Sequence, residues 1–302
     1  MGAGFVFCAD PLRASRTDPV FAEEAALARE HGAAVALLDH DALLAGDTAA
    51  ALARVRRDSG PYWYRGWMMP AAVYETLERG LYERGCALLT GAGAYRRAHE
   101  LPGWYEEFAH LTPRSGWQAG QPGAPPAQDE LAALAAPLGT GPGVVKDFVK
   151  SRKHEWDEAC FVPELADPAG VAAVVGRFFA LQEDSLAGGV VLRAYERFVP
   201  GGEARVWWLD GTPVLTTAHP DTPGRLPEPE LGAVSVAVRA LGCRFVTTDM
   251  ALREDGAWRV VEVGDGQVSG LPAGADATEL FAALAGADST GQRRRPPSES
   301  MT

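Results

Sequence analysis

The stretch VVKDFVKSRKHEWDEAC, residues 144–160, places four basic side chains directly after an apolar run: Lys146, Lys150, Arg152 and Lys153. In a strand running through VVKDFVK, side chains alternate between two faces, so Lys146 and Lys150 are expected to share one face. A basic side chain is costly to bury in an apolar strand unless an anion meets it. The stretch therefore predicts an anion site, and a solvated surface loop is the alternative interpretation of the same four charges.

The composition limits what that anion can belong to. The 302 residues include 28 Lys and Arg against 40 Asp and Glu, a formal charge of −12, and 47% of them are hydrophobic. This composition is typical of a soluble globular protein of one or two domains. An acidic chain has no electrostatic footprint for nucleic acid or an anionic membrane, so neither is expected as a partner. The anion is expected to be bound locally.

The cysteines and the start of the chain bear on the compartment. Cys8, Cys86, Cys160 and Cys243 form no CxxC pair, which argues against a zinc site and a disulfide framework. The opening MGAGFVFCADPLR has no basic region followed by a long apolar core, and no apolar run of the chain is long enough to span a bilayer. A cytoplasmic protein with reduced thiols is expected.

The first third of the chain alternates strand-like and helix-like runs. The strand-like runs are 4–10, 33–39, 61–67 and 86–91, and the helix-like runs are 18–32, 43–55 and 70–85. Asp18 with Pro19 supplies a typical helix start, and Gly85 a typical helix stop. This alternation predicts a parallel sheet covered by helices. We expect an α/β substrate domain over residues 1–117, followed by a Gly- and Pro-rich linker over 118–129.

The second half predicts a mainly antiparallel sheet with packed helices over residues 130–288, followed by a disordered tail over 289–302. Around one helical run, 167–185, the strand-like runs are 143–149, 189–199, 203–211, 212–221, 244–255 and 258–266. Asp249 lies in the second-last run, and Glu262 and Asp265 lie in the last. The turn EDGA at 254–257 allows these two strands to pair, which would bring Asp249 close to Glu262. Carboxylates beside basic side chains indicate a magnesium and nucleotide site.

Basic residues also occur in the strands between. Arg193 and Tyr195 share one face of the run 189–199, with Glu196 on the other, and Arg205 opens the next run. A structural ion pair between Arg193 and Glu196 is the alternative explanation for these two charges.

The order of these features resembles the ATP-grasp superfamily, specifically the divergent clade named for one arginine and two lysines. The clade's lysine, loop, lysine, tryptophan pattern resembles Lys146, Lys153 and Trp156, and its arginine-bearing strand resembles VVLRAY at 190–195. Its Glu-x-Arg stretch resembles Glu203 and Arg205, and its metal-binding acids resemble Asp249 and Glu262. Relatives commonly place Asn two residues after the second acid, where this chain has Gly264 followed by Asp265. The phosphate loop VKSRKHEW also contains no glycine, so side-chain charge would have to replace backbone amides.

The resemblance implies an ATP-grasp fold that binds ATP and Mg2+. The nucleotide-binding residues that it implies are Lys146, Lys153, Arg193, Ala194, Tyr195, Glu196, Glu203 and Arg205. The metal ligands would be Asp249, Glu262 and Asp265, and the catalytic residues Arg193, Arg205 and Lys153. Lys150 receives no role, and Arg65 in YWYRGW is open between the mouth of a cleft and the core.

The activity implied is ATP-dependent ligation of a carboxylate to an amine through an acylphosphate. The substrates would be a peptide, a protein or small molecules, which the sequence does not identify. The main alternative is an ATP-binding assembly factor for a partner protein, since one eukaryotic member of the clade assists assembly of a translation initiation factor. Phosphoryl or nucleotidyl transfer without ligation is a third.

Overall fold

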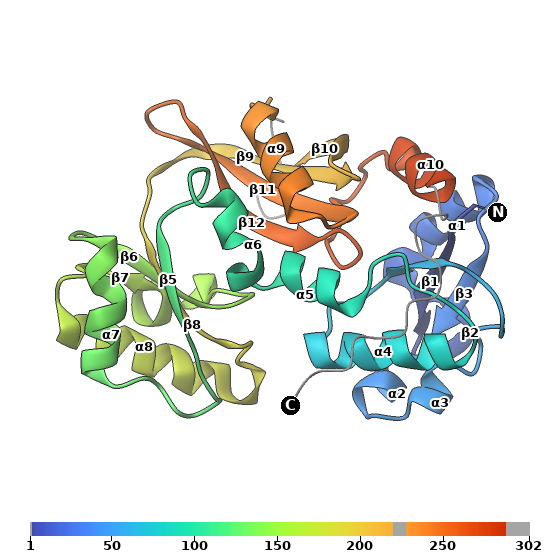
Figure 1. Cartoon of the computed structure of the whole chain (residues 1–302), viewed down its shortest axis with the longest axis horizontal. Helices are drawn as coiled ribbons and strands as arrows, with labels where there is room; N and C mark the ends of the chain where they lie inside the picture. The colour runs from blue at the N-terminus through green and yellow to red at the C-terminus, as the bar shows by residue number, and fades with distance from the viewer. Residues whose placement is uncertain (1, 220–227, 288–302) are drawn as a thin grey trace.

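The computed structural model describes residues 2–219 and 228–287, so the tail predicted at 289–302 lies outside the described residues. The described residues form three four-stranded sheets with helices packed on them. In Figure 1 the N-terminal sheet lies at the right, a second sheet at the top centre and a third at the left. This α+β architecture confirms the fold class predicted from the sequence.

The N-terminal sheet is built around β1 (Gly4–Asp10), which pairs in parallel with β3 (Val35–Leu38) and β4 (Tyr62–Arg65). A short β2 (Arg13–Thr17) pairs with β1 in the antiparallel sense. The parallel sheet predicted here is therefore confirmed, with one antiparallel edge strand added. The run 86–91 forms no strand and makes a single bridge between Tyr62 and Leu88.

Three helices lie between these strands along the chain, and three more follow β4. They are α1 (Ala22–Glu30), α2 (His40–Leu44), α3 (Thr48–Ala51), α4 (Ala71–Glu83), α5 (Ala92–His99) and α6 (Leu101–Phe108). Asp18 accepts a hydrogen bond from Val20 N before the first helical turn, as the sequence predicted. The run 43–55 was expected to be one helix, but it is interrupted at Gly46, whose φ is +83°, and α3 restarts where Asp47 caps it.

The central sheet has the order β10-β9-β11-β12 and is antiparallel throughout. Its strands are β9 (Phe198–Leu209), β10 (Thr212–Ala218), β11 (Phe245–Arg253) and β12 (Trp258–Asp265). One face is covered by α6 and α9 (Gly232–Leu241), whose apolar side chains pack around Trp208 and Val246. The register places Asp249 opposite Glu262, which confirms the pairing predicted from the turn between them.

The third sheet has the order β5-β8-β6-β7. Its strands are β5 (Ser115–Ala119), β6 (Gly143–Asp147), β7 (Phe161–Val162) and β8 (Gly189–Ala194). The helices α7 (Gln128–Ala135) and α8 (Pro168–Gln182) cover one face, where Val145, Val190 and Leu192 are buried. The second half was expected to form one antiparallel sheet, but the chain leaves β8 at Ala194 and enters a different sheet at Phe198.

Two segments cross the domain bounds expected from the sequence, which remain a prediction. Strand β5 runs through residue 117 and pairs with β8. Helix α10 (Thr278–Gly286) returns to the N-terminal sheet, where Ala3 N donates to Ala285 O at 3.2 Å and Trp63 Nε1 donates to Leu284 O at 3.0 Å. The end of the described chain is therefore packed on its beginning.

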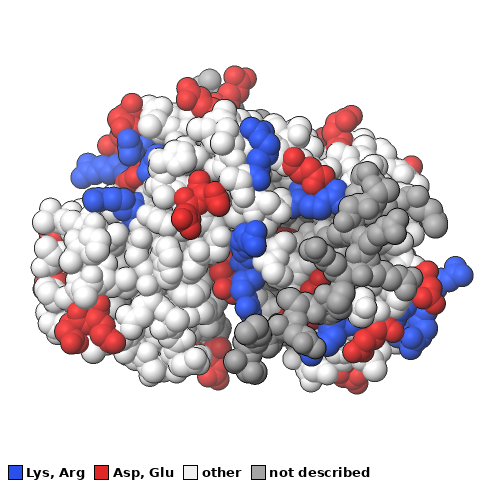
Figure 2. Space-filling model, viewed as in Figure 1, with Lys and Arg blue, Asp and Glu red and all other residues white. Residues whose placement is uncertain are grey.

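The surface is mixed in charge on the face shown in Figure 2, where Lys and Arg are interspersed with Asp and Glu. Among the described helices there is no segment of the length and apolarity needed to cross a membrane.

Candidate functional site

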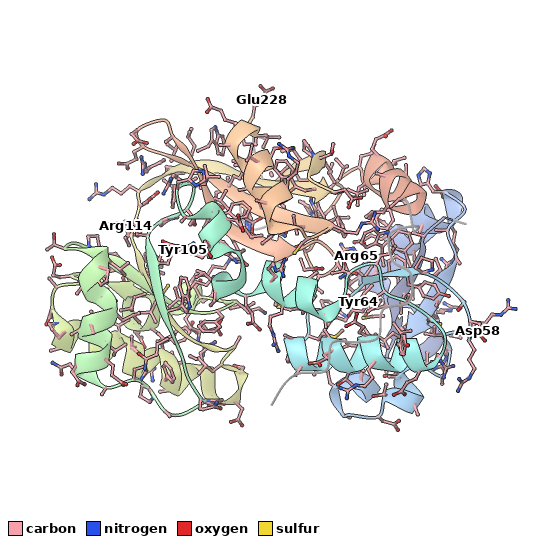
Figure 3. All side chains as sticks on the ribbon, viewed as in Figure 1. Asp58, Tyr64, Arg65, Tyr105, Arg114 and Glu228 are labelled. Atoms are coloured by element: carbon pink, nitrogen blue, oxygen red, sulfur yellow. The ribbon has the colours of Figure 1, made fainter. Side chains whose placement is uncertain are left out.

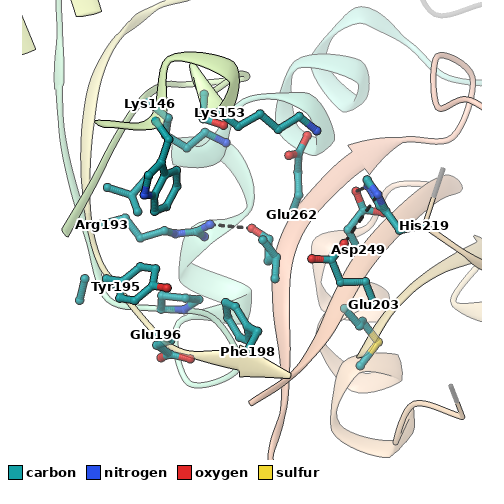
Figure 4. A pocket seen from close by; sticks show the side chains of 17 residues that line it. Lys146, Lys153, Arg193, Tyr195, Glu196, Phe198, Glu203, His219, Asp249 and Glu262 are labelled. Carbon is teal, nitrogen blue, oxygen red and sulfur yellow. Dashed lines mark hydrogen bonds and ion pairs between the residues drawn. The ribbon is translucent and has the colours of Figure 1, made fainter. Parts of the chain in front are cut away.

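A cavity of about 490 Å³ lies between the central sheet and the third sheet (Figure 4). Its lining includes Lys146, Lys153, Trp156, Arg193, Ala194, Tyr195, Glu196, Phe198, Glu203, His219, Asp249 and Glu262. Nine of the eleven residues that the sequence analysis assigned to a site are in this lining; Arg205 and Asp265 are not. The structure thus gathers residues that are up to 116 positions apart, from Lys146 to Glu262, around one space.

Lys146 reaches the cavity because β6 alternates. Val145 points to the helices α7 and α8, so its neighbours Val144 and Lys146 point the other way, toward the central sheet. The lysine is 5% exposed, and its Nζ donates to Val149 O at 3.2 Å. Burial lowers the pKa of Lys146, and the Glu262 carboxylate opposes that shift. A buried ammonium with one backbone acceptor can still donate two hydrogen bonds to a ligand.

Lys150 does not share that face, and the prediction that it would is wrong. Strand β6 ends at Asp147, whose Oδ1 accepts from the backbone N–H groups of Val149 and Lys150. This turn reverses the chain, so Lys150 is exposed and absent from the lining of the cavity. Side chains alternate between two faces only within a strand, so the alternation does not extend beyond the end of β6.

Lys153 begins a short 3-10 helix, Lys153–Glu155, which leads into one turn of π-helix, Trp156–Cys160. Arg152 anchors the loop by donating to Leu181 O, and it lies 3.8 Å from Glu155. In Figure 4 the Lys153 side chain extends across the top of the cavity toward Glu262. The second lysine therefore enters the cavity from the loop, opposite the acids of the central sheet.

Arg193 lies on the cavity-facing side of β8 and is 6% exposed. Its guanidinium donates to Ser115 Oγ at 3.1 Å, to Thr112 Oγ1 at 2.8 Å and to Val261 O at 2.6 Å. Burial lowers its pKa to about 10, with Glu262 acting in the opposite direction. Three of its five N–H donors are used, so the group is fixed in place and keeps its charge beside the cavity.

Glu196 is not the partner of Arg193. Its carboxylate accepts from Arg259 at 2.9 and 3.0 Å and lies 3.5 Å from Arg253. Glu196 therefore pairs with Arg259, and the ion pair suspected between Arg193 and Glu196 is not formed. Beside it, Tyr195 packs edge-on against Trp156 and Phe161, with ring centroids 6.1 and 5.6 Å away.

Arg205 and Asp249 form a two-pronged ion pair on the floor of the cavity. The Arg205 Nε and Nη2 atoms donate to the two Asp249 oxygens at 2.7 and 2.8 Å, and Nη1 donates to Gly270 O. Burial raises the pKa of Asp249, but the hydrogen bonds and charges of Arg205 and His219 outweigh it and lower the pKa to about 2. Asp249 is therefore a carboxylate already engaged by its neighbours.

His219 is a residue of the site that sequence reasoning missed. It lies at the end of β10, with Nε2 3.3 Å from Asp249 and Nδ1 3.7 Å from Glu203. The hydrogen bond with Asp249 raises the pKa of His219. A lone histidine outside any ligand spacing gave no signal, because its partners come from two other strands.

Asp265 lies away from the cavity. It is three residues beyond Glu262 on β12, and an odd spacing along a strand turns the side chain to the opposite face. There it is completely buried, accepting from Gln267 N and Nε2 through Oδ1. The structure does not bring this carboxylate to the other acids, so it does not fit the metal-binding role predicted for it.

Arg65 is buried in the core at the end of β4, where Figure 3 shows it with Tyr64 at the junction between the N-terminal sheet and the central part of the molecule. It is 1% exposed and pairs with both Glu24 oxygens, at 2.5 and 2.8 Å. The suggestion that it lies at the mouth of a cleft is therefore wrong. It instead ties the loop after β12 to the N-terminal sheet by donating to Gln267 O and Ser269 O.

The acids of the cavity suit a metal ion only in company with a ligand. The described residues contain no group of three or more metal-binding side chains around one point. Mg2+ is commonly held by one or two carboxylates together with phosphate oxygens and water, and Glu262 with Asp249 matches that need. The fit is therefore to a metal ion that arrives with phosphates.

Residues 137–284 match a family model for the ATP-grasp domain, family 3 of the clade named for one arginine and two lysines. The chain carries an ATP-grasp domain of this clade. This confirms the resemblance found in the sequence, and the matched region contains every residue that lines the cavity except Pro113.

Solved structures resemble the chain over almost its whole length. D-cycloserine synthetase DcsG is 18% identical with a TM-score of 0.61, and the match covers 93% of this chain and 97% of that one. An ATP-grasp RimK domain protein from Sphaerobacter thermophilus DSM 20745 is 16% identical with a TM-score of 0.57, covering 94% and 99%. The ATP-grasp ligase PsnB, complexed with minimal precursor, Mg and ADP, is 14% identical with a TM-score of 0.56, covering 93% and 96%. At these identities the likeness establishes the fold. No curated protein matches the chain significantly.

Proposed function

We propose that the chain is an ATP-dependent carboxylate–amine ligase that binds Mg2+ and ATP in the cavity between the central and third sheets. The observation that carries the proposal is the convergence of Lys146, Lys153 and Arg193 on a space whose opposite wall holds Glu262 and Asp249. Several cations facing carboxylates across about 490 Å³ match a polyphosphate and its metal ion. The ATP-grasp domain and the ligase fold neighbours support the assignment.

The nucleotide is proposed to lie with its base against the chain between β8 and β9. Ala194, Tyr195 and Phe198 line this end of the cavity, where aromatic rings are available to a purine. Glu203 lies further along, in reach of the ribose. Lys146 and Lys153 would contact the phosphates, and Arg193, anchored by Ser115 and Thr112, would add its charge from a fixed position.

Glu262 is the main metal-holding carboxylate in this proposal. Asp249 has both oxygens occupied by Arg205, with His219 close to one of them, so it has fewer lone pairs to offer. A bound magnesium ion supplies neutralisation of the β- and γ-phosphate oxygens. Asp265 is not included, because it faces the other side of β12.

The proposed reaction has two steps. A carboxylate oxygen of the first substrate attacks the γ-phosphorus, the bond to the bridging oxygen breaks, and ADP leaves with an acylphosphate formed. The amine nitrogen of the second substrate then attacks the acyl carbon, loses a proton to solvent, and expels inorganic phosphate. Lys146, Lys153 and Arg193 would hold and neutralise the transferring group, so no protein nucleophile is needed.

Trapping with hydroxylamine tests the proposal. The chain would be incubated with Mg2+, ATP, hydroxylamine and pools of amino acids or short peptides, since four similar structures contain a ligase with its precursor or a variant of that precursor. We expect pool-dependent ADP, phosphate and hydroxamate in equal amounts. AMP in place of ADP would contradict the acylphosphate route. ATP binding without turnover in any pool, with stoichiometric capture of one protein, would favour the assembly-factor alternative.

A further inference from the structure

The N-terminal sheet carries a second candidate binding surface at the carboxyl ends of its parallel strands. Asp10 ends β1, Asp39 directly follows β3, and Trp67 lies two residues beyond β4. The loops that leave these strands surround a small hollow of about 50 Å³, lined mainly by Asp10, Asp18, Asp39, His40, Asp41 and Trp67. In open α/β sheets this edge is where ligands bind. We call this surface the acidic hollow.

The acidic hollow contains four carboxylates, those of Asp10, Asp18, Asp39 and Asp41. Backbone N–H groups position three of them: Leu12 N donates to Asp10 at 2.8 Å, Val20 N to Asp18 at 2.9 Å and Ala42 N to Asp39 at 3.0 Å. Within the described residues, none of the four forms an ion pair with a basic side chain. The negative charge is therefore held in place by the loops and is not neutralised by them.

Trp67 lines the hollow, and four other large apolar side chains that are exposed to solvent lie near its residues in the sequence. Leu12 is 93% exposed, Val20 62%, Leu44 48%, Trp67 43% and Met68 37%. Leu12 and Val20 each lie two residues after an aspartate of the hollow and donate a backbone hydrogen bond to it. Leu44 lies one helical turn after His40 in α2. Trp67 and Met68 follow β4, and a Met68 backbone group lies beside the His40 ring. Exposed apolar side chains gathered around polar ones mark interaction surfaces.

The surface is preformed. The Trp67 indole donates to Asp18 Oδ2 at 2.9 Å, and its ring packs edge-on against Phe21 with centroids 5.2 Å apart. The tryptophan is therefore fixed while much of it remains exposed, which lowers the entropic cost of covering it.

We propose that the acidic hollow binds a segment of a partner protein in which basic and apolar side chains alternate. The hollow is large enough for the end of one lysine or arginine side chain and too small for a cofactor. Apolar neighbours of that side chain would cover Leu12, Trp67 and Met68, and the carboxylates would select against acidic segments. This surface is separate from the nucleotide cavity, so the inference does not depend on the proposed ligase activity.

Fluorescence anisotropy with synthetic peptides tests the inference on the full chain. The probe is a labelled heptapeptide of alternating lysine and leucine, compared with glutamate–leucine and lysine–serine peptides of the same length. We expect the lysine–leucine peptide to bind at least tenfold more tightly than either. Asp39→Asn with Asp41→Asn should weaken it about tenfold, and Leu12→Ser should weaken it severalfold. Asn at 39 keeps the helix cap, and position 12 is exposed, so neither change should affect folding.

The matched control is Glu106→Gln with Glu107→Gln on α6, which removes the same charge from exposed positions outside the hollow. If this control weakens binding as much as the aspartate pair does, the attraction is only general, and the proposal is overturned. Equal binding of all three peptides would also overturn the proposal. A dimer in light scattering that Leu12→Ser dissociates would instead identify a second copy of the chain as the occupant. Binding that appears only when Arg293, Arg294 and Arg295 are replaced by Ser would identify the chain's own C-terminal segment.

Discussion

Two regions of the molecule use the same residue types in opposite ways. In the cavity, Lys146 and Arg193 are buried beside Glu262 and open space, and neither forms an ion pair within the described residues. At the seam between β12 and the N-terminal sheet, Arg65 is equally buried but pairs with Glu24 through two hydrogen bonds. Charges that the chain itself neutralises hold the two parts together, whereas charges left facing a cavity are available to a ligand.

Two acids of β12 that lie three residues apart show the same contrast between a side chain that faces the cavity and one that is buried in the structure. Glu262 faces the cavity, and Asp265 faces the seam, where burial raises its pKa to about 7. Its Oδ2 is buried and makes no hydrogen bond in the described chain.

The largest expected effect separates these two acids. Glu262→Gln should reduce single-turnover ADP formation about a thousandfold, or about 4 kcal/mol of transition-state stabilisation, because it removes the main metal-holding charge. Asp265→Asn should stay within about threefold of wild type, since it faces away from the nucleotide. The measurement is ADP formation across a magnesium titration in the presence of an active substrate pool. Equal losses in the two variants would contradict this division of β12.

The second largest effect is expected for Arg65→Met, which should lower the free energy of unfolding by about 3 kcal/mol. It leaves the Glu24 carboxylate without its partner and removes donors from the loop at 267–269. The control is Arg96→Met, which breaks a partly exposed pair with Glu100 at 3.6 Å and should cost less than about 1 kcal/mol. Urea denaturation measures both. Similar losses would mean that the seam does not depend on this pair.

Asp265 should make the stability of the protein depend on pH. Its pKa lies near 7 in the folded chain against the usual 3.8, because burial favours the neutral form, so the folded state binds the extra proton between these values. This contribution is present below about pH 4, is lost as the pH rises toward 7, and stays lost above it. Asp265→Asn should therefore gain about 2 kcal/mol relative to wild type between pH 5 and pH 8. If the free energies of unfolding of wild type and Asp265→Asn, measured by urea denaturation, differ by the same amount at both pH values, the pKa of Asp265 is not raised by burial and the prediction is wrong.

The smallest effect compares two lysines of one stretch. Lys146→Ala should weaken ATP binding about tenfold, or about 1.4 kcal/mol. It should not lower the melting temperature, because burying a charge without an ion-pair partner costs free energy and the substitution removes that charge. Lys150→Ala should change the affinity by less than about twofold, since this lysine is exposed beyond the turn at Asp147. Loss of folding in Lys146→Ala with no separate change in affinity would identify a structural lysine.

Local patterns predicted a large part of this structure. The alternation of side chains predicted all four strands of the central sheet and two of the third sheet, β6 and β8, but not β5 or β7. The short turn at 254–257 was enough to place Asp249 opposite Glu262. The resemblance to the ATP-grasp clade supplied the order of the site residues, and nine of them line one cavity.

What the sequence could not supply depends on distant contacts. Whether Arg65 faces a cleft or the core is decided by Glu24, which lies 41 residues away. The face of Asp265 depends on where β12 begins, and the end of β6 depends on Asp147 accepting from the two backbone groups that follow it. His219 acquires its place only when β10, β9 and β11 are side by side.

The central claim is that the cavity between the two antiparallel sheets binds ATP with magnesium, and calorimetric titration tests it most directly. The account predicts one site per chain for ATP in the presence of Mg2+, with weaker binding when Mg2+ is withdrawn or when Lys146 is replaced by Ala. It also predicts that Glu262→Gln removes most of the dependence on Mg2+. No heat of binding with Mg2+ present, or binding that is unchanged in both variants, would contradict it.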